Sequence, residues 1–168
     1  MNLSGDSLDR QSVTPPLDGV AVQRERDAAV LEGLRPATLI LGLLFLVLGI
    51  VNLLWIPERA GILAAAAFGT AAVFIMLHIV LVRYAPTQPG GNALAALVAG
   101  LVTLNSLLHL AVSDNPVQTT NLVLVVVGAG YLLTSTRWLV GLLAATFAGW
   151  WGIAQAAGSV QDWRQFGY

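Results

Sequence analysis

Long apolar blocks separated by isolated charges dominate the hydrophobic pattern of this chain. Between positions 35 and 162 the charged residues are Glu58, Arg59, Arg83, Asp114 and Arg137. The charge-free blocks between them cover 36–57, 60–82, 84–113, 115–136 and 138–161. A hydrocarbon core of about 30 Å needs about 20 apolar helical residues, and a charge at its centre costs about 2.5–3.5 kcal/mol. Charges placed only at the breaks therefore predict a chain that crosses a membrane five times.

The predicted fold is an all-α, polytopic transmembrane helix bundle with five complete spans and the start of a sixth. The expected spans are 36–56, 60–82, 92–112, 117–135 and 138–157, within a five-helix transmembrane domain over 36–161. Residues 162–168 turn from Asp-Trp-Arg-Gln to Phe-Gly-Tyr, which is typical of an outer loop that leads into another span. We therefore expect the chain to be the N-terminal piece of a longer protein, with a complete five-span protein as the alternative.

The first 35 residues differ from the rest in composition. Residues 1–19 are rich in Ser, Asp, Pro and Gly, and we expect a disordered tail because little apolar surface is available to offset the ordering entropy. Residues 20–35 predict a short amphipathic helix at the membrane surface. Its apolar positions are Val22, Ala29, Val30 and Leu34, and its charged positions are Arg24, Glu25, Arg26, Asp27 and Glu32. A solvated helical extension of the first span fits the same pattern equally well.

Composition supports a membrane protein and gives it an orientation. The chain is 57% hydrophobic and 10% charged, far from the soluble norm of about 25% charged. It has no cysteine, so disulfides and thiolate metal sites are excluded. With the N-terminus in the cytoplasm, the inner segments hold Arg24, Arg26, Arg35, Arg83 and Arg137, and the outer ones hold Arg59 and Arg164. The positive-inside rule then predicts a cytoplasmic N-terminus. We expect a multi-pass protein of the cell (inner) membrane, with the lipid bilayer as its partner and no nucleic acid.

Polar residues inside the spans gather in the predicted outer half of the bundle. The candidate ligand-pocket residues are Asn52, Asn105, His109, Thr120, Asn121, Trp151 and Gln155. Asn105 and His109 are four residues apart and share one helix face. Convergent polar groups are the usual mark of a ligand site. The competing interpretation is that these groups bond helix to helix at about 0.6–2 kcal/mol each, and both interpretations remain open.

Several activities lack the residues that they need. No block has Asp, Glu, Lys or Arg in its interior, which disfavours proton pumps, ion-coupled transporters and voltage sensors. Paired carboxylates and a glycine-rich phosphate loop are missing from the sequence, so we expect no enzymatic activity and no metal or cofactor. His78 and His109 lie at opposite ends of their spans, about 15 Å apart in depth, so one haem iron would need a second chain or another ligand.

Small residues recur at four-residue spacing in three of the blocks. These stripes are Gly61-Ala65-Gly69, Ala96-Gly100 and Gly141-Ala145-Gly149. Small residues at this spacing let helix backbones approach closely in lipid, so we expect the stripes to face neighbouring helices of the same bundle.

A family resemblance follows from several short motifs. The stretch Asn-Pro-Val-Gln-Thr-Thr-Asn at 115–121 is preceded by Leu-His-Leu at 108–110 and followed by Gly-Ala-Gly at 128–130, Arg-Trp-Leu at 137–139 and Asp-Trp-Arg-Gln-Phe at 162–166. Together they resemble the N-terminal membrane regions of bacterial signalling proteins, in which about six helices precede PAS, GGDEF diguanylate cyclase or histidine kinase domains. The resemblance covers about 35–168. It implies a sensory or anchoring domain of a signal-transduction protein, with an unknown ligand and a homodimer formed through a downstream output domain. A small complete integral membrane protein, either a neutral-solute carrier or a helix-packing scaffold, is the alternative, and a haem-binding membrane protein is the third.

Overall fold

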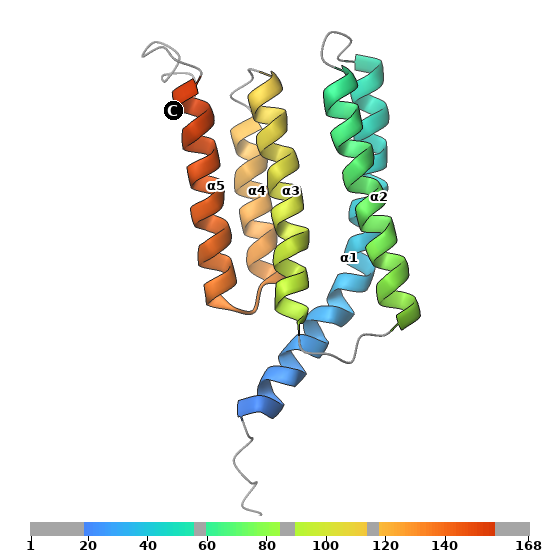
Figure 1. Cartoon of the computed structure of the whole chain (residues 1–168), viewed down its shortest axis with the longest axis vertical. Coiled ribbons are helices and arrows are strands. Elements are labelled where there is room, and N and C mark those ends of the chain that lie inside the picture. The colour runs from blue at the N-terminus through green and yellow to red at the C-terminus, as the bar shows by residue number, and fades with distance from the viewer. Residues whose placement is uncertain (1–18, 56–59, 85–89, 114–117, 157–168) are drawn as a thin grey trace, which may run out of the picture.

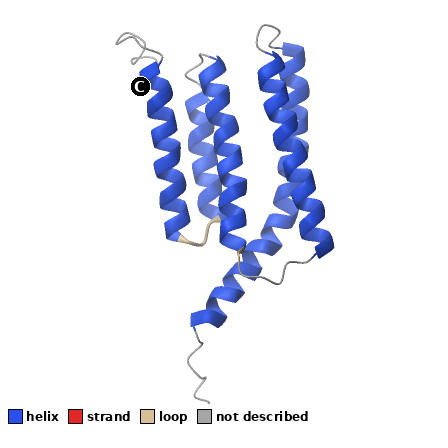
Figure 2. Ribbon diagram, viewed as in Figure 1, coloured by secondary structure: helices blue, strands red, loops and turns tan. Residues whose placement is uncertain are grey.

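The computed structural model describes residues 19–55, 60–84, 90–113 and 118–156, and all regular structure in these ranges is helical. The helices are α1 (Gly19–Trp55), α2 (Ala60–Tyr84), α3 (Gly91–Ser113), α4 (Gln118–Leu132) and α5 (Thr136–Ala156). They stand side by side with alternating direction, as Figures 1 and 2 show. The all-α prediction is confirmed. The predicted tail over 1–19, apart from Gly19, and the predicted loop at 162–168 lie outside the described residues.

Four helices are long and apolar enough to cross a membrane, by length and composition: α1, α2, α3 and α5. The count of five complete spans is not confirmed, because α4 has only 15 residues. At 1.5 Å per residue it is about 22 Å long, less than a hydrocarbon core of about 30 Å. The sequence predicted this span over 117–135, but the structure has a turn at 133–135. Leu139 N–H donates to the Ser135 carbonyl there, so Ser135 is the N-cap residue of α5.

Helix α1 runs without interruption through Pro36 and has 37 residues. One helix thus covers both the predicted juxtamembrane helix and the first span. Its N-terminal part runs obliquely beneath α3, and its later part stands upright beside α2 (Figure 1). Proline removes one backbone donor and bends a helix. Beyond Pro36, the Thr38 hydroxyl lies within hydrogen-bond distance of the Leu34 and Arg35 carbonyls, at 2.9 and 3.0 Å.

The core lies along a seam on α1 that repeats at three- and four-residue steps. Its buried members, from the N-terminal to the C-terminal end of α1, are Asp27, Leu31, Leu34, Thr38, Gly42, Phe45, Gly49 and Asn52. This spacing is the signature of helices that pack at a shallow angle. Helix α2 lies antiparallel to α1 and inserts Phe74 beside Phe45, with ring centroids 5.8 Å apart. Helices α3, α4 and α5 form a second group, with α3 central to the bundle (Figure 1).

The glycines that bring helices together are mostly not those of the predicted stripes. A Cβ on Gly61, Gly69, Gly100 or Gly141 would meet nothing within 4 Å. Of the predicted glycines only Gly149 makes a close approach, with its Cβ position 2.6 Å from Leu107. Helix α1 instead uses Gly42 and Gly49, which are seven residues apart and face Ile75 and Phe68 of α2. Small residues are so frequent here that spacing alone did not identify the contact faces.

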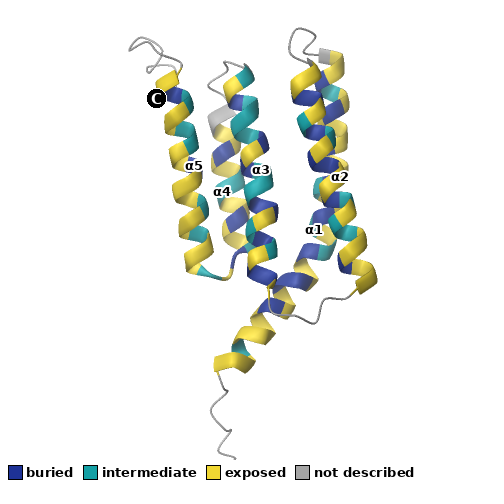
Figure 3. Cartoon of the chain, in the orientation of Figure 1, coloured by how far each residue is buried: buried dark blue, intermediate teal, exposed yellow. Residues whose placement is uncertain are grey.

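The surface of the bundle is apolar over most of its height. Large aliphatic and aromatic side chains are exposed on every helix. Figure 3 shows exposed residues along each of the helices. Monomeric soluble proteins rarely expose contiguous apolar areas of this extent. The four long apolar helices and this surface are compatible with a membrane protein.

Candidate functional site

Two groups of polar side chains lie at opposite ends of α1. We name them after the predicted topology: the group near the C-terminal end of α1 is the outer group, and the group near its N-terminal end is the inner group. The outer group contains Asn52 of α1 together with Thr70, Asn105 and His109 from α2 and α3. His109 Nε2 lies 3.3 Å from Asn52 Oδ1. A carbonyl oxygen only accepts, so Nε2 donates in this arrangement. One turn along α3, Asn105 Nδ2 donates to the Thr70 hydroxyl at 3.1 Å. These bonds connect α3 to both helices of the α1–α2 pair.

The outer group contains buried polar atoms without a hydrogen-bond partner. They are Nδ2 of Asn52 and Nδ1 of His109, on the two side chains that bond to each other. A buried donor or acceptor without a partner costs about 1–3 kcal/mol. The side chains of this group therefore retain capacity for a further polar contact.

The structure brings together three of the seven predicted pocket residues: Asn52, Asn105 and His109. The other four, Thr120, Asn121, Trp151 and Gln155, are exposed on α4 and α5. Trp151 packs against the Phe147 ring and lies beside Trp150, with centroid distances of 6.3 and 6.5 Å. The three gathered residues bond helix to helix, as the competing interpretation expects, and a ligand pocket that includes all seven stays a prediction.

The two histidines belong to different ends of the bundle. His78 Nδ1 donates to the Arg35 carbonyl at 2.8 Å, whereas His109 bonds to Asn52. Arg35 and Asn52 lie about 25 Å apart along α1 at 1.5 Å per residue. Both histidines are therefore interhelical hydrogen-bonding residues in this arrangement, and one haem iron does not reach both.

The inner group is a chain of three side chains at the other end of α1. Asn92 Nδ2 donates to the Asp27 carboxylate at 2.9 Å, and the Thr134 hydroxyl donates to Asn92 Oδ1 at 2.9 Å. Asp27 and Asn92 are both buried, at 6% and 5% exposed. The chain joins α1, the first turn of α3 and the turn before α5.

A backbone contact supports this inner chain. A Cβ on Gly91 would overlap the carbonyl oxygen of Asp27 and lie 3.1 Å from its Cα. Helix α3 therefore begins directly against the backbone of α1, and only glycine fits there. This contact places Asn92 beside Asp27.

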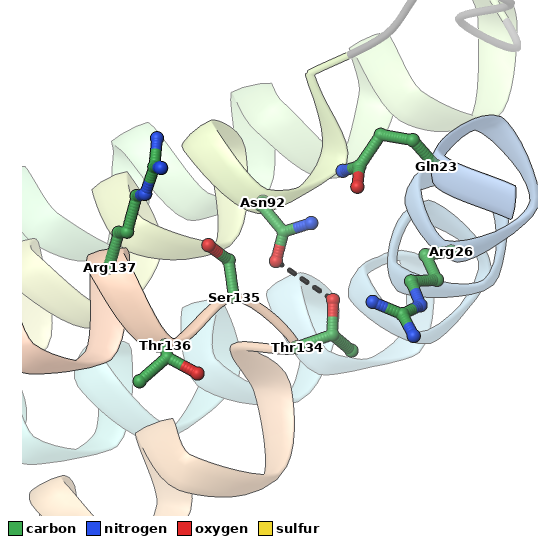
Figure 4. A pocket seen from close by; sticks show the side chains of 7 residues that line it. All are labelled: Gln23, Arg26, Asn92, Thr134, Ser135, Thr136 and Arg137. Atoms are coloured by element: carbon green, nitrogen blue, oxygen red, sulfur yellow. Dashed lines mark hydrogen bonds between the residues drawn. The ribbon is translucent and has the colours of Figure 1, made fainter. Parts of the chain in front are cut away.

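A polar pocket of about 260 Å³ opens beside the inner group. Its amide side chains are Gln23 and Asn92, its hydroxyl side chains are Thr134, Ser135 and Thr136, and its cations are Arg26 and Arg137. Figure 4 shows Arg26 and Arg137 at opposite ends, with Asn92, Ser135 and Thr134 between them. Among the described residues no carboxylate lines the pocket, and the Asp27 carboxylate bonds to Asn92. We call this the inner pocket.

Sequence reasoning did not find the inner pocket. It used Arg26 and Arg137 only to orient the chain, and it read Asp27 as part of a solvated face. The available signal was Asn92 directly after two glycines, at the start of a span. Only the bend of α1 beneath α3 brings residues this distant in sequence together.

Within the described ranges, no three His, Asp or Glu side chains gather as a metal site would require. Comparison of the chain with protein-family models, curated proteins and solved structures finds no match. The resemblance to bacterial signalling proteins therefore stays a prediction.

Proposed function

We propose that this chain is a membrane-embedded sensory or anchoring domain of a bacterial signal-transduction protein. The observation that supports the proposal is that one uninterrupted helix carries both polar groups. Asn52 and Asp27 lie about 37 Å apart along α1, at 1.5 Å per residue. A stimulus that changes packing at one end of α1 is thereby communicated to the other end.

The outer group suits detection of a stimulus, and the inner group suits its transmission. The outer Asn52–His109 bond is long, at 3.3 Å, and each partner keeps a buried atom without a hydrogen bond. A ligand or lipid that supplies a partner there would favour one packing arrangement over another. A stimulus acts only through such differential affinity. The inner group then reports the change to the side of the membrane where α1 begins.

The proposed topology has the N-terminus in the cytoplasm and places α4 across the membrane together with the four longer helices. The direction of α4, antiparallel to α3 and α5, supports this placement (Figure 1). The natural lack of cysteine makes single-cysteine labelling a direct test. In intact cells, Val20→Cys should resist a membrane-impermeant maleimide and react after permeabilisation. Labelling of Val20→Cys in intact cells would overturn the orientation.

Communication between the two ends is tested by distance measurements on spin labels. The labels are placed at two exposed inner positions, Val20→Cys on α1 and Val140→Cys on α5. His109→Ala, at the outer end, should shift the distribution of distances between them in lipid nanodiscs. Leu104→Ala is the matched control, because Leu104 is exposed on the same helix. An unchanged distribution in His109→Ala would leave the outer group without a sensory role.

A further inference from the structure

The inner pocket and an adjoining groove have the chemistry of a phospholipid site. We propose that they bind one anionic phospholipid, with its phosphate in the inner pocket and an acyl chain in the groove. The inference rests on the membrane insertion assumed in the proposed function, and it assigns a ligand to a part of the molecule that the proposed function leaves without one.

The charge of the pocket selects an anion. Arg26 and Arg137 are both exposed in its lining, so their guanidinium groups are accessible to a ligand. Asp27 is a nearby acid, and its carboxylate accepts from Asn92, outside the lining. Among the described lining residues the charged ones are the two arginines, so the lining itself is positive. Arginine forms bidentate hydrogen bonds to phosphate oxygens, which makes phosphate a suitable anion.

Neutral donors add to the charge. Helix α3 begins at Gly91 and α5 at Thr136, so two helix N-termini adjoin the pocket. The N–H groups of a first helical turn have no acceptor within their helix and favour an anion. Ser135 and Thr136 add hydroxyl groups to the lining. The pocket thus surrounds a phosphate with donors from three segments of the chain.

The groove explains why a lipid fits better than free phosphate. It lies between α1, α3 and α4, has a volume of about 290 Å³, and is lined only by apolar residues and glycine, among them Leu41, Val98, Val102, Gly128 and Leu132. Leu132 lies two residues before Thr134, and Val102 lies ten after Asn92. On α3, at 1.5 Å per residue, the groove lining from Val98 to Val102 lies about 9 to 15 Å above Asn92. A polar pocket followed by an apolar groove matches a phosphate headgroup followed by an acyl chain.

A second groove offers room for the other acyl chain. It lies between α3 and α5, has a volume of about 480 Å³ and includes Ala93, Leu97, Trp138 and Gly141. Ala93 and Trp138 directly follow the pocket residues Asn92 and Arg137. Both grooves therefore have lining residues within two positions of a pocket residue in the sequence, Leu132 in the first and Ala93 and Trp138 in the second.

The test measures binding of phosphatidylglycerol and phosphatidylcholine to the purified full chain in detergent by native mass spectrometry. Phosphatidylglycerol should bind more tightly, because phosphatidylcholine carries a compensating cation. Arg26→Gln and Arg137→Gln should each weaken phosphatidylglycerol binding about fivefold. Arg83→Gln is the matched control, because Arg83 is an exposed arginine at the inner end of α2 and outside the pocket. Equal losses in all three variants, or equal binding of the two lipids, would overturn the site.

A second pair of variants tests the groove. A Cβ on either Gly128 or Gly130 would meet nothing within 4 Å, and only Gly128 lines the groove. Gly128→Leu should weaken phosphatidylglycerol binding several-fold, and Gly130→Leu should not. Inorganic phosphate should fail to displace the bound lipid. Full binding by Gly128→Leu together with displacement by inorganic phosphate would identify a site for free phosphate and overturn the lipid proposal.

Membrane insertion is measured separately, by resistance of the chain to carbonate extraction from cell membranes. Lost lipid selectivity with intact insertion contradicts this inference alone. Release by carbonate contradicts the membrane domain on which both proposals rest.

Discussion

The two polar groups of the bundle differ in how completely their hydrogen bonds are satisfied. At the inner end, two bonds of 2.9 Å join Asp27, Asn92 and Thr134, and the α3 backbone touches α1 at Gly91. At the outer end, Asn52 and His109 form one bond of 3.3 Å, and each keeps a buried atom without a partner. Fully paired polar networks rigidify a structure, whereas partly paired ones leave an alternative arrangement close in energy. The inner group is therefore the more firmly bonded of the two, and the outer group is the place where packing changes at the lowest cost.

The largest effect is expected from Gly91→Ala. The new methyl group overlaps the Asp27 carbonyl oxygen, and a backbone atom does not move aside as a flexible side chain does. Overpacking of this kind costs about 1–3 kcal/mol, and we expect the upper end. The measurement is the thermal unfolding midpoint in detergent micelles. Gly100→Ala on the same helix has open space around it and should be neutral or more stable. Equal midpoints for the two variants would contradict a close backbone contact between α3 and α1 at Gly91.

Asn92→Ala is expected to have the next largest effect. It removes the donor to Asp27 and the acceptor for Thr134, which leaves a buried carboxylate with one partner fewer. Such losses cost about 1–3 kcal/mol, measured as above. In a double-mutant cycle with Asp27→Ala, the two costs should be clearly non-additive. Additive costs would mean that the two side chains do not stabilise each other.

Asn52→Leu should cost less than 1 kcal/mol. Its bond to His109 is long, and the substitution also removes a buried Nδ2 that lacks a partner. Hydrogen bonds between membrane helices average about 0.6 kcal/mol in double-mutant cycles. A loss of stability as large as that of Asn92→Ala would remove the difference between the two ends.

Thr103→Val provides the baseline for the comparison. The Thr103 hydroxyl donates to the Ala99 carbonyl of its own helix at 2.8 Å and joins no two helices. Valine has nearly the same shape, so we expect a change of about 0.5 kcal/mol or less in the free energy of unfolding. A larger loss would show that hydrogen bonds within one helix contribute as much as those between helices.

The sequence predicted the helices well because charges mark their ends. A charge inside a span is costly, so the breaks near Arg59 and Arg83 follow from composition alone. The predicted and observed ends of α2 differ by only two residues, 60–82 against Ala60–Tyr84. The exception is the C-terminal end of α4, where residues 133–135 are needed for the turn into α5.

Contacts between helices were harder to predict, and each miss has a physical reason. Gly42 and Gly49 form a close contact face because Ile75 and Phe68 lie opposite, and neither partner follows from spacing on α1. The pairing of Asp27 with Asn92 depends on the direction that α1 takes around Pro36. The depth of a residue in the membrane, by contrast, follows directly from its position within a span. The pairing of Asn52 with His109 agrees with the predicted depth of both residues.

The short helix α4 has a mechanical consequence within the proposed topology. Its 15 residues are about 8 Å shorter than an average hydrocarbon core, whereas α1 is about 55 Å long. Lipids beside α4 would have to compress, while α1 accommodates thickness by tilting. In a bilayer of longer lipids, compression of the lipid beside α4 would cost more free energy, and the preferred tilt angle of α1 would change. Bilayer thickness would thus act on α4 through lipid compression and on α1 through its tilt.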